Sequence, residues 1–274
     1  MINYGKQYLD QKDISAVVKV LKSDWLTQGP KVQEFENSLK FFFGAKYCTA
    51  VSNGTAALHL AVKAMGWKKG DHIFTTPISF LATSNAILYA GAKPVFVDID
   101  LNTFNIDVKK LEKKIKILKK QKKRLAGIIA TDYAGQPCDW KALKLIGKKY
   151  NLRLINDNCH AIGASFYKNK KYACKYADIV TQSYHPVKNI TTGEGGSILT
   201  NSKTLDGKIK LLRSHGVIKK KNKLPWSYEM QVLGFNYRLS DVNCALGISQ
   251  LKKINKFIKK RQVIAKIYDK AFKI

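Results

Sequence analysis

The stretches LRLINDNCHA (residues 152–161) and SYHPVKNITTGEGG (residues 183–196) decide the fold of this chain. The first is an apolar run of the kind that forms a buried strand, and it leads into Asp157. The second continues from a further apolar run and places Lys188 in a turn rich in glycine and threonine, 31 residues after Asp157. The sequence therefore predicts a carboxylate at the end of a strand and a lysine in a turn of small residues.

This pairing of a carboxylate with a lysine is what pyridoxal phosphate chemistry requires. The lysine forms a Schiff base with the cofactor, and the aspartate partners the pyridinium nitrogen. Burying Asp157 is costly unless it meets a cation, which the pyridinium N–H supplies. Lys188 has a plain alternative as a surface lysine, because 44 of the 49 basic residues are lysines. Its turn behind a buried strand favours a desolvated amine, which can also move a proton between two carbon atoms.

Two segments that carry hydroxyl groups predict a phosphate site. Residues 52–56, SNGTA, join a strand to a helix, and backbone N–H groups at the start of a helix bind anions. Many tight turns of this kind use glycine and threonine for geometry alone. Thr55 and Ala56 gain weight as candidates from Ser183, which supplies a second hydroxyl five residues before the lysine.

Two ring side chains are further candidates for the cofactor site. Phe80 follows an expected strand and could stack on a flat cofactor ring, although core packing is the commoner role of an aromatic residue there. His160, three residues after Asp157, could hold the phenolic oxygen of the cofactor, and a purely structural histidine is an equal alternative.

Apolar runs alternate with helical periodicity along the chain, which predicts a mostly parallel sheet covered by helices on both faces. Asp13 is expected to cap a first helix that ends near residue 23, and a second helix is expected after Pro30. Strands are predicted over residues 47–51, 72–76, 94–97, 125–131, 152–156, 179–183 and 197–200. Further helices are predicted over residues 56–65, 79–89, 139–150 and 252–272.

The formal net charge of +30 is compatible with a nucleic-acid or anionic-membrane partner. Only five of the 49 basic residues are arginines, however, and bidentate guanidinium groups are what base and phosphate readers favour. The lysines occur in short runs on presumed helix faces. A nucleic-acid role is therefore not expected, and the charge is interpreted as a solvated surface that helps to draw in an anionic substrate.

The five cysteines are odd in number and lack CxxC spacing, so we expect reduced thiols and neither a disulfide framework nor a metal site. No run approaches the ~18 apolar residues that a membrane span needs. The first residues lack the layout of a secretory signal. These features predict a cytoplasmic protein that does not enter a membrane.

Several stretches, taken together, resemble the DegT/DnrJ/EryC1/StrS family of sugar aminotransferases. They are LTQGP (26–30), VSNGTAALH (51–59), GAKPV (91–95), TTGEGG (191–196), RSHG (213–216) and GFNYRL (234–239). The resemblance covers essentially the whole chain. It implies an α/β fold of the aspartate aminotransferase type, fold type I among pyridoxal phosphate enzymes, with a mostly parallel sheet and helices on both faces.

Within the family the chain looks most like the pseudaminic acid branch, on the stretches AGQPCD (134–139), HPVKNITTGEGG (185–196) and WSYEMQ (226–231). That branch moves the amino group of L-glutamate to the C4 ketone of a UDP-linked 4-keto-6-deoxy amino sugar. The resemblance therefore implies a pyridoxal 5'-phosphate-dependent transaminase that uses these two substrates.

The resemblance also implies roles for individual residues. Lys188 corresponds to the catalytic Schiff-base lysine. The cofactor-binding set implied is Asp157 at the ring nitrogen, His160 beside the ring hydroxyl, Phe80 on the ring face, and Thr55, Ala56 and Ser183 at the phosphate. The family forms homodimers in which the neighbouring subunit completes each site, and Asn236 is the candidate that reaches across. Arg213, His215 and Arg238 are candidates for contacts with the sugar nucleotide or a carboxylate.

Two departures from the family pattern stand out. Family members commonly have Glu-Asp-Ala where this chain has Asn156-Asp157-Asn158. They also continue past the long final helix into a smaller C-terminal domain, which we expect to be missing here. We accordingly expect a cofactor-binding large domain over residues 1–250, including an N-terminal helical segment over 1–45, and a helix over 251–274. The alternative function is a catalytically impaired family member that binds the cofactor or a sugar nucleotide.

Overall fold

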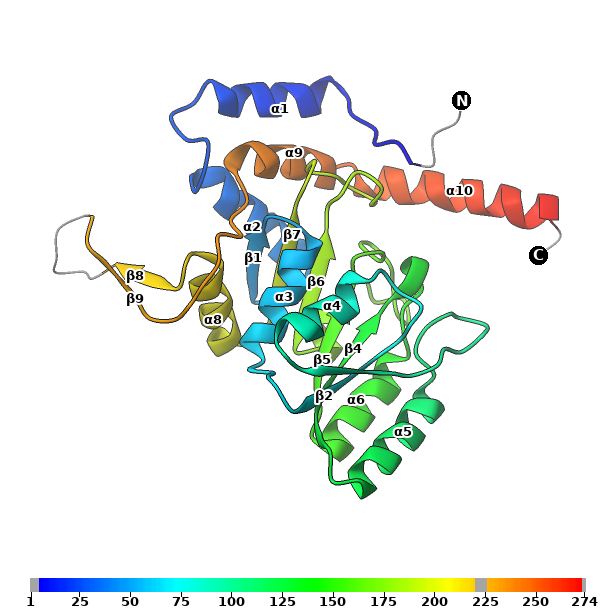
Figure 1. Ribbon diagram of the computed structural model, residues 1–274. Helices are drawn as coiled ribbons and strands as arrows, with labels where there is room; N and C mark the ends of the chain where they lie inside the picture. The colour runs from blue at the N-terminus through cyan, green and yellow to red at the C-terminus, as the bar shows by residue number, and fades with distance from the viewer. Residues whose placement is uncertain (1–4, 220–225, 273–274) are drawn as a thin grey trace.

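The apolar runs form one central seven-stranded sheet in the computed structural model, which describes residues 5–219 and 226–272 (Figure 1). The order across the sheet is β1-β7-β6-β5-β4-β2-β3. The strands β2 to β6 pair in parallel, and β7 is antiparallel to both of its neighbours, β1 and β6. The strands are β1 (Tyr47–Val51), β2 (Asp71–Thr75), β3 (Lys93–Phe96), β4 (Arg124–Thr131), β5 (Arg153–Asp157), β6 (Ile179–Ser183) and β7 (Gly196–Thr200).

Helices cover both faces of this sheet, which confirms the predicted α/β architecture. Along β4, Ile128 belongs to one apolar core and its neighbour Ile129 to another, because side chains on a strand alternate between faces. The helices are α1 (Gln11–Leu21), α2 (Pro30–Phe43), α3 (Gly54–Ala64), α4 (Ala82–Tyr89), α5 (Val108–Lys120), α6 (Trp140–Tyr150), α7 (Ala173–Tyr176), α8 (Lys203–Arg213), α9 (Asp241–Leu251) and α10 (Ile254–Phe272).

Some elements differ from the sequence prediction. The first helix is capped by Asp10, whose side chain accepts from the N–H groups of Lys12 and Asp13. The predicted cap, Asp13, instead fills the third position of a capping box and is buried against Lys253. The sequence did not predict the helices α5, α7, α8 and α9 or the small hairpin of β8 (Val217–Lys219) and β9 (Tyr228–Met230).

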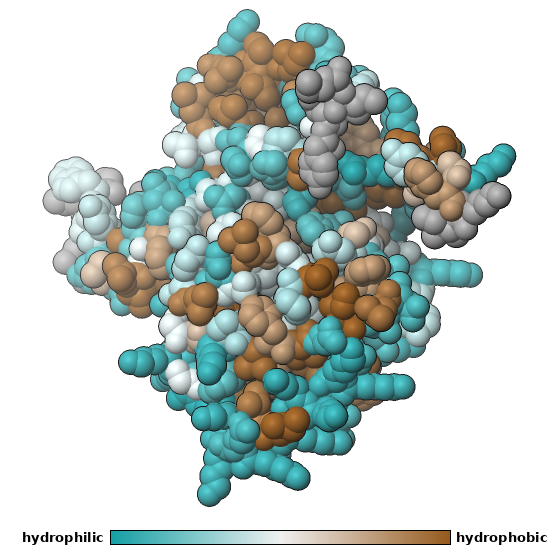
Figure 2. Space-filling model, turned by 45° about the vertical axis from the view of Figure 1, so that its right-hand side comes forward, coloured by the Kyte–Doolittle hydropathy of each residue, from teal (hydrophilic) through white to brown (hydrophobic). Residues whose placement is uncertain are grey.

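Apolar side chains remain exposed on the two helices that border the top of the molecule. On α1 these are Ile14, Val18 and Leu21, and the space-filling view shows an apolar patch over this helix (Figure 2). Several apolar side chains of α10 are exposed as well, among them Ile264 and Ile267. None of the helices in the described ranges is long and apolar enough to cross a membrane.

Glycines allow β6 and β7 to approach the start of α3 closely. A Cβ at Gly54 would lie 2.8 Å from the Cβ of Ser183, and a Cβ at Gly196 would lie 2.5 Å from the carbonyl oxygen of Asn53. Both distances are shorter than the contacts that Cβ atoms make in folded proteins, so a side chain at either position would force a shift. The Asn-Gly-Thr turn and the Gly-Gly pair therefore bring the end of β6 onto the N-terminus of α3.

A fully buried carboxylate, Asp132, ties down the chain where β4 ends. Its Oδ1 accepts hydrogen bonds from the N–H of Cys138 and from Nε1 of Trp140, both at 2.8 Å. Its Oδ2 accepts from the hydroxyl of Tyr172 at 2.5 Å. Burial raises the pKa of the Asp132 carboxyl, and these donors act in the opposite direction by favouring its charged form.

The asparagines beside Asp157 complete the set of donors to Asp132. The Nδ2 groups of Asn156 and Asn158 donate to Oδ2 of Asp132 at 3.1 and 2.8 Å. Glutamate, which the family resemblance leads us to expect at position 156, would place a second acid against this buried carboxylate. The more polar surroundings of Asp157 thus form a matched set with Asp132, which holds the end of β5.

We expect Asp132→Asn to lower the free energy of unfolding by about 3–5 kcal/mol. The substitution replaces one carboxylate oxygen, which accepts hydrogen bonds, by an NH2 group that would face other donors in a buried site. Urea unfolding of the cofactor-free chain measures the loss. Asp139→Asn is the matched control, since asparagine caps α6 as well as the exposed Asp139 does. A loss no larger than that of the control would contradict the role assigned to Asp132.

Candidate functional site

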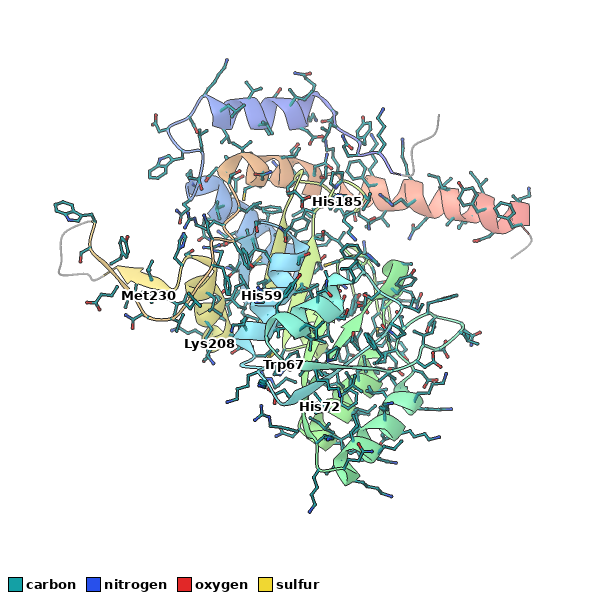
Figure 3. The ribbon with its side chains drawn as sticks, in the orientation of Figure 1. His59, Trp67, His72, His185, Lys208 and Met230 are labelled. Carbon is teal, nitrogen blue, oxygen red and sulfur yellow. The ribbon has the colours of Figure 1, made fainter. Side chains whose placement is uncertain are left out.

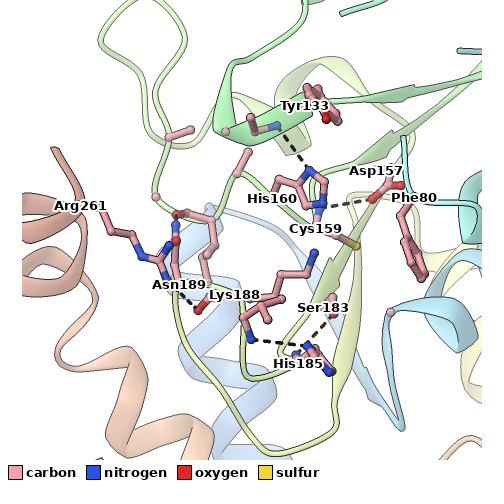
Figure 4. Close-up of a pocket in the computed structure, with 18 of the residues that line it drawn as sticks. Phe80, Tyr133, Asp157, Cys159, His160, Ser183, His185, Lys188, Asn189 and Arg261 are labelled. Carbon is pink, nitrogen blue, oxygen red and sulfur yellow. Dashed lines mark hydrogen bonds between the residues drawn. The ribbon is translucent and has the colours of Figure 1, made fainter. Parts of the chain in front are cut away.

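A pocket of about 1640 Å³ opens at the carboxyl ends of the parallel strands, where ligands bind in open α/β sheets. It is lined by residues from the first turn of α3, the segment before α4, the end of β5, the turn after β6 and one side of α10 (Figure 4). Six predicted cofactor residues line this pocket: Thr55, Phe80, Asp157, His160, Ser183 and Lys188.

Asp157 is the last residue of β5 and is 4% exposed. Its Oδ2 accepts a hydrogen bond from the hydroxyl of Thr83 at 2.7 Å, and its Oδ1 accepts a longer one, 3.3 Å, from the N–H of Cys159. Among the described residues none forms an ion pair with this carboxylate. A buried carboxylate that faces a pocket in this way is suited to a cationic ligand atom.

His160 lies on the same wall of the pocket, and its tautomer follows from its hydrogen bond. The backbone N–H of Ala134 donates to Nδ1 of His160 at 3.4 Å, so the neutral ring carries its proton on Nε2. Burial, and then the positive charge of Lys188, lower the pKa of His160, while Asp157 opposes them. The ring is therefore neutral at pH 7 and has Nε2–H free to donate.

Lys188 stands in the turn between β6 and β7. The turn is braced by a hydrogen bond from the Lys188 N–H to the carbonyl of His185 at 2.9 Å and by the Thr192 N–H, which donates to the carbonyl of Tyr184 at 3.0 Å. From α10, Arg261 donates to the Lys188 carbonyl at 3.3 Å. Figure 4 shows the lysine side chain extending into the same space as His160 and Cys159.

The start of α3 forms the opposite end of the pocket. Thr55 lies in the first turn of the helix, whose N–H groups have no partners within the helix, and Ser183 faces it from the end of β6. Ala56 does not line the pocket, and its N–H is donated to the Asn53 side chain at 2.8 Å. The N–H of Ala56, which was predicted to bind the phosphate, is therefore already taken by the N-cap residue Asn53.

Four other predicted residues lie outside the pocket. Arg213 pairs with Glu36 at 2.9 Å and donates to the Ala50 carbonyl, which makes it part of the link between α8 and α2. His215, Asn236 and Arg238 do not line the pocket either. Asn236 is exposed and forms an isolated antiparallel β-bridge with Ser214.

These four residues lie in the segments that precede and follow the β8–β9 hairpin, whose Met230 is well separated from the pocket residue His185 (Figure 3). The segment after the hairpin returns to the strand end before α3, because the N–H of Ser52 donates to the carbonyl of Tyr237 at 2.9 Å. None of the four lines the pocket of its own subunit.

Sequence reasoning missed several residues that build the site. Thr83 donates to Asp157, Tyr133 lines the pocket beside His160, and Arg261 contacts the Lys188 turn. No local motif marks them, because each meets its partner only through the fold.

Comparison with known proteins decides the family. The sequence pattern of the DegT/DnrJ/EryC1/StrS aminotransferase family matches residues 7–274. The chain belongs to the DegT/DnrJ/EryC1/StrS aminotransferase family. This confirms the family predicted from the sequence motifs.

Among curated members of this family, a Campylobacter jejuni UDP-4-amino-4,6-dideoxy-N-acetyl-beta-L-altrosamine transaminase is 47% identical to the chain over 272 residues. The alignment covers 99% of this chain and 70% of that relative. The transaminase of the same name from Helicobacter pylori is 39% identical over 272 residues, covering 98% of this chain and 69% of the relative.

Solved structures agree with this assignment. The H. pylori aminotransferase PseC, involved in the biosynthesis of pseudoaminic acid, superimposes with a TM-score of 0.90 at 37% identity, over 99% of this chain and 70% of PseC. A sugar aminotransferase from Streptococcus pneumoniae in its PMP form gives a TM-score of 0.90 at 28% identity, over 99% of this chain and 72% of the other.

Aminotransferases of this family use pyridoxal phosphate, and the residues of the pocket fit it. Asp157 is a buried carboxylate without a cation of its own among the described residues, and it suits the ring nitrogen. The glycine-dependent approach of Ser183 to the start of α3 suits the phosphate. Lys188 brings a primary amine into the same pocket.

In the cofactor-free chain we expect the NMR titration midpoint of His160 to lie below 6.5, since burial is the main cause of its lowered pKa. The histidine then contributes stability that is complete above pH 6.5 and is lost as the pH falls from there through the lowered pKa. Lys188→Ala should move the midpoint upward, because it removes the second cause.

Lys170→Ala, which changes another pocket lysine, is the control and should leave the midpoint unchanged. A Lys188→Ala midpoint equal to that of the wild type would show that the Lys188 charge does not reach His160.

Proposed function

We propose that this chain transfers the amino group of L-glutamate to C4 of a UDP-linked 4-keto-6-deoxy-N-acetylhexosamine, a step in the biosynthesis of pseudaminic acid. The observation that carries the proposal is the convergence of Asp157, His160 and Lys188 in one pocket at the strand ends. The substrate class is supported by the relatives named as altrosamine transaminases and by the structural neighbour PseC.

Pyridoxal phosphate, when bound, accepts the amino group of one substrate, passes it to the next and takes up the electron pair released at the reacting carbon. Lys188 is the amine that attaches the cofactor. Once displaced by a substrate, its Nζ is free to take a proton from one carbon and return it to another. The reaction runs in two halves, in which glutamate leaves as 2-oxoglutarate before the keto sugar is aminated.

The remaining pocket residues would hold the cofactor in place. The carboxylate of Asp157 would keep a proton on the ring nitrogen, and His160, with its proton on Nε2, would donate to the ring oxygen. The hydroxyls of Thr55 and Ser183 and the N–H groups at the start of α3 would bind the phosphate. The ring of Phe80, 62% exposed, is available to cover the ring face of the cofactor.

We infer that two copies of the chain form a homodimer. Asn236 is exposed and lies outside the pocket of its own subunit, which leaves it available to a neighbouring site. His215 is likewise exposed outside the pocket, and Arg238 is half-buried outside it. Exposed apolar side chains on α1 offer a surface that association would bury (Figure 2).

We also infer a cytoplasmic location, since Cys48, Cys138, Cys174 and Cys244 are buried free thiols. A nucleic-acid partner is not proposed, because the net charge of +30 comes mainly from lysines spread over the surface.

Incubation with L-[¹⁵N]glutamate and the UDP-linked 4-keto sugar should place ¹⁵N on the sugar and release one 2-oxoglutarate per amino sugar. Mass spectrometry of both products measures the ratio. Lys188→Ala should lower the rate by more than about 1000-fold, as loss of a catalytic nucleophile and base does. Lys170→Ala, which also removes a pocket lysine, should retain most of the rate.

Transfer by Lys188→Ala at the wild-type rate would contradict the proposal. Cofactor binding without any transfer by the wild type would favour the alternative of a cofactor-binding family member that does not turn over.

A further inference from the structure

The buried hydroxyl of Thr83, on α4, donates a hydrogen bond to the carboxylate of Asp157 at the end of β5. The proposed reaction does not itself require this hydroxyl. Thr83 is 1% exposed, and its Oγ1 lies 2.7 Å from Oδ2 of Asp157, although the two residues are 74 positions apart in the sequence. This is a charge-assisted hydrogen bond between buried partners, which is the stronger class of hydrogen bond.

Two more hydroxyls extend this contact away from the carboxylate. Oγ of Ser79 lies 2.9 Å from Oγ1 of Thr83 and 3.1 Å from Oγ1 of Thr131 at the end of β4. The three hydroxyls thus join the segment before α4 and the helix itself to the ends of β4 and β5.

The direction of the chain follows from the fact that each hydroxyl has one proton. An ionised carboxylate only accepts hydrogen bonds, so Thr83 donates its proton to Asp157. Oγ1 of Thr83 must then accept from Ser79, and Oγ of Ser79 must accept from Thr131. Every dipole in the chain points toward Asp157, and aligned hydrogen bonds strengthen one another.

We propose that Thr83, backed by Ser79 and Thr131, is a positioning residue that fixes the orientation of the Asp157 carboxylate toward the ring nitrogen of pyridoxal phosphate. Donation to the charged form of a carboxylate stabilises that form. The bond also links β5 to α4, so the carboxylate does not turn freely in the pocket. This inference rests on the proposed place of the cofactor ring beside Asp157.

The chain contains a matched pair that separates this role from ordinary packing. Thr49 is a fully buried threonine whose hydroxyl donates to the carboxylate of Asp206 at 3.1 Å, between β1 and α8. Neither residue lines the pocket. Thr49→Val removes a hydroxyl of the same kind from a buried acid that does not face the cofactor.

The experiment is a titration of each purified full chain with pyridoxal phosphate, followed by absorbance, with thermal unfolding of the cofactor-free proteins measured alongside. We expect Thr83→Val to bind the cofactor about 10- to 100-fold more weakly, the range for loss of a hydrogen bond to a charged group. Thr83→Ser, which keeps the hydroxyl, should stay within about threefold of the wild type. Thr49→Val should bind the cofactor as the wild type does.

A double-mutant cycle with Asp157→Asn tests whether Thr83 acts through the carboxylate. In that background Thr83→Val should cost less than about threefold in affinity, since the charge that Thr83 supports is gone. Wild-type binding by Thr83→Val, or the same loss in both backgrounds, would overturn the proposal. Should Thr83→Val fail to fold, Ser79→Ala is decisive: a loss of about threefold to tenfold supports the chain, and unchanged binding overturns it.

The outcomes also keep this inference apart from the proposed function. A wild-type chain that binds no pyridoxal phosphate contradicts the proposed function. Normal binding by Thr83→Val contradicts only the role of Thr83, because the titration does not depend on sugar turnover.

Discussion

The site depends on the burial of one carboxylate, Asp157, at the end of a central parallel strand. An ion held away from water is unfavourable unless other groups replace its hydration, and here the protein supplies only part of that replacement. Thr83 and the Cys159 N–H donate to it, and none of the described residues pairs with it as a cation. A protonated pyridine ring would supply such a cation, so the buried carboxylate favours binding of the cofactor.

A second buried acid determines which hydrogen-bond donors are left for Asp157. Asp132 follows β4 next to the end of β5, and its N–H donates to the carbonyl of Asp157 at 3.1 Å. The two carboxylates belong to separate sets of donors, because Asn156 and Asn158 turn their amides to Asp132. Asp157 is left with the face toward the pocket. The two asparagines beside Asp157 thus serve the acid that follows the neighbouring strand.

Much of this arrangement could be predicted from local sequence. An apolar run predicts the strand that ends in Asp157, and a series of small residues predicts the turn that carries Lys188. The Asn-Gly-Thr sequence predicts the start of α3. Partners that are distant in sequence could not be predicted. Arg213 looked like a substrate contact, yet it pairs with Glu36, 177 residues away, and the hydroxyl of Thr83 reaches Asp157 only because β2 and β5 flank β4. Such pairings are set by the packing of whole elements, and no periodicity records them.

The most direct test of the account asks which lysine holds the cofactor. The chain loaded with pyridoxal phosphate is reduced with borohydride, which fixes the cofactor to the lysine that bears it, and is then digested and analysed by mass spectrometry. The account predicts modification of Lys188 in nearly every molecule, although 44 of the 49 basic residues are lysines. Modification spread over surface lysines, or concentrated on a lysine outside the pocket, would contradict it.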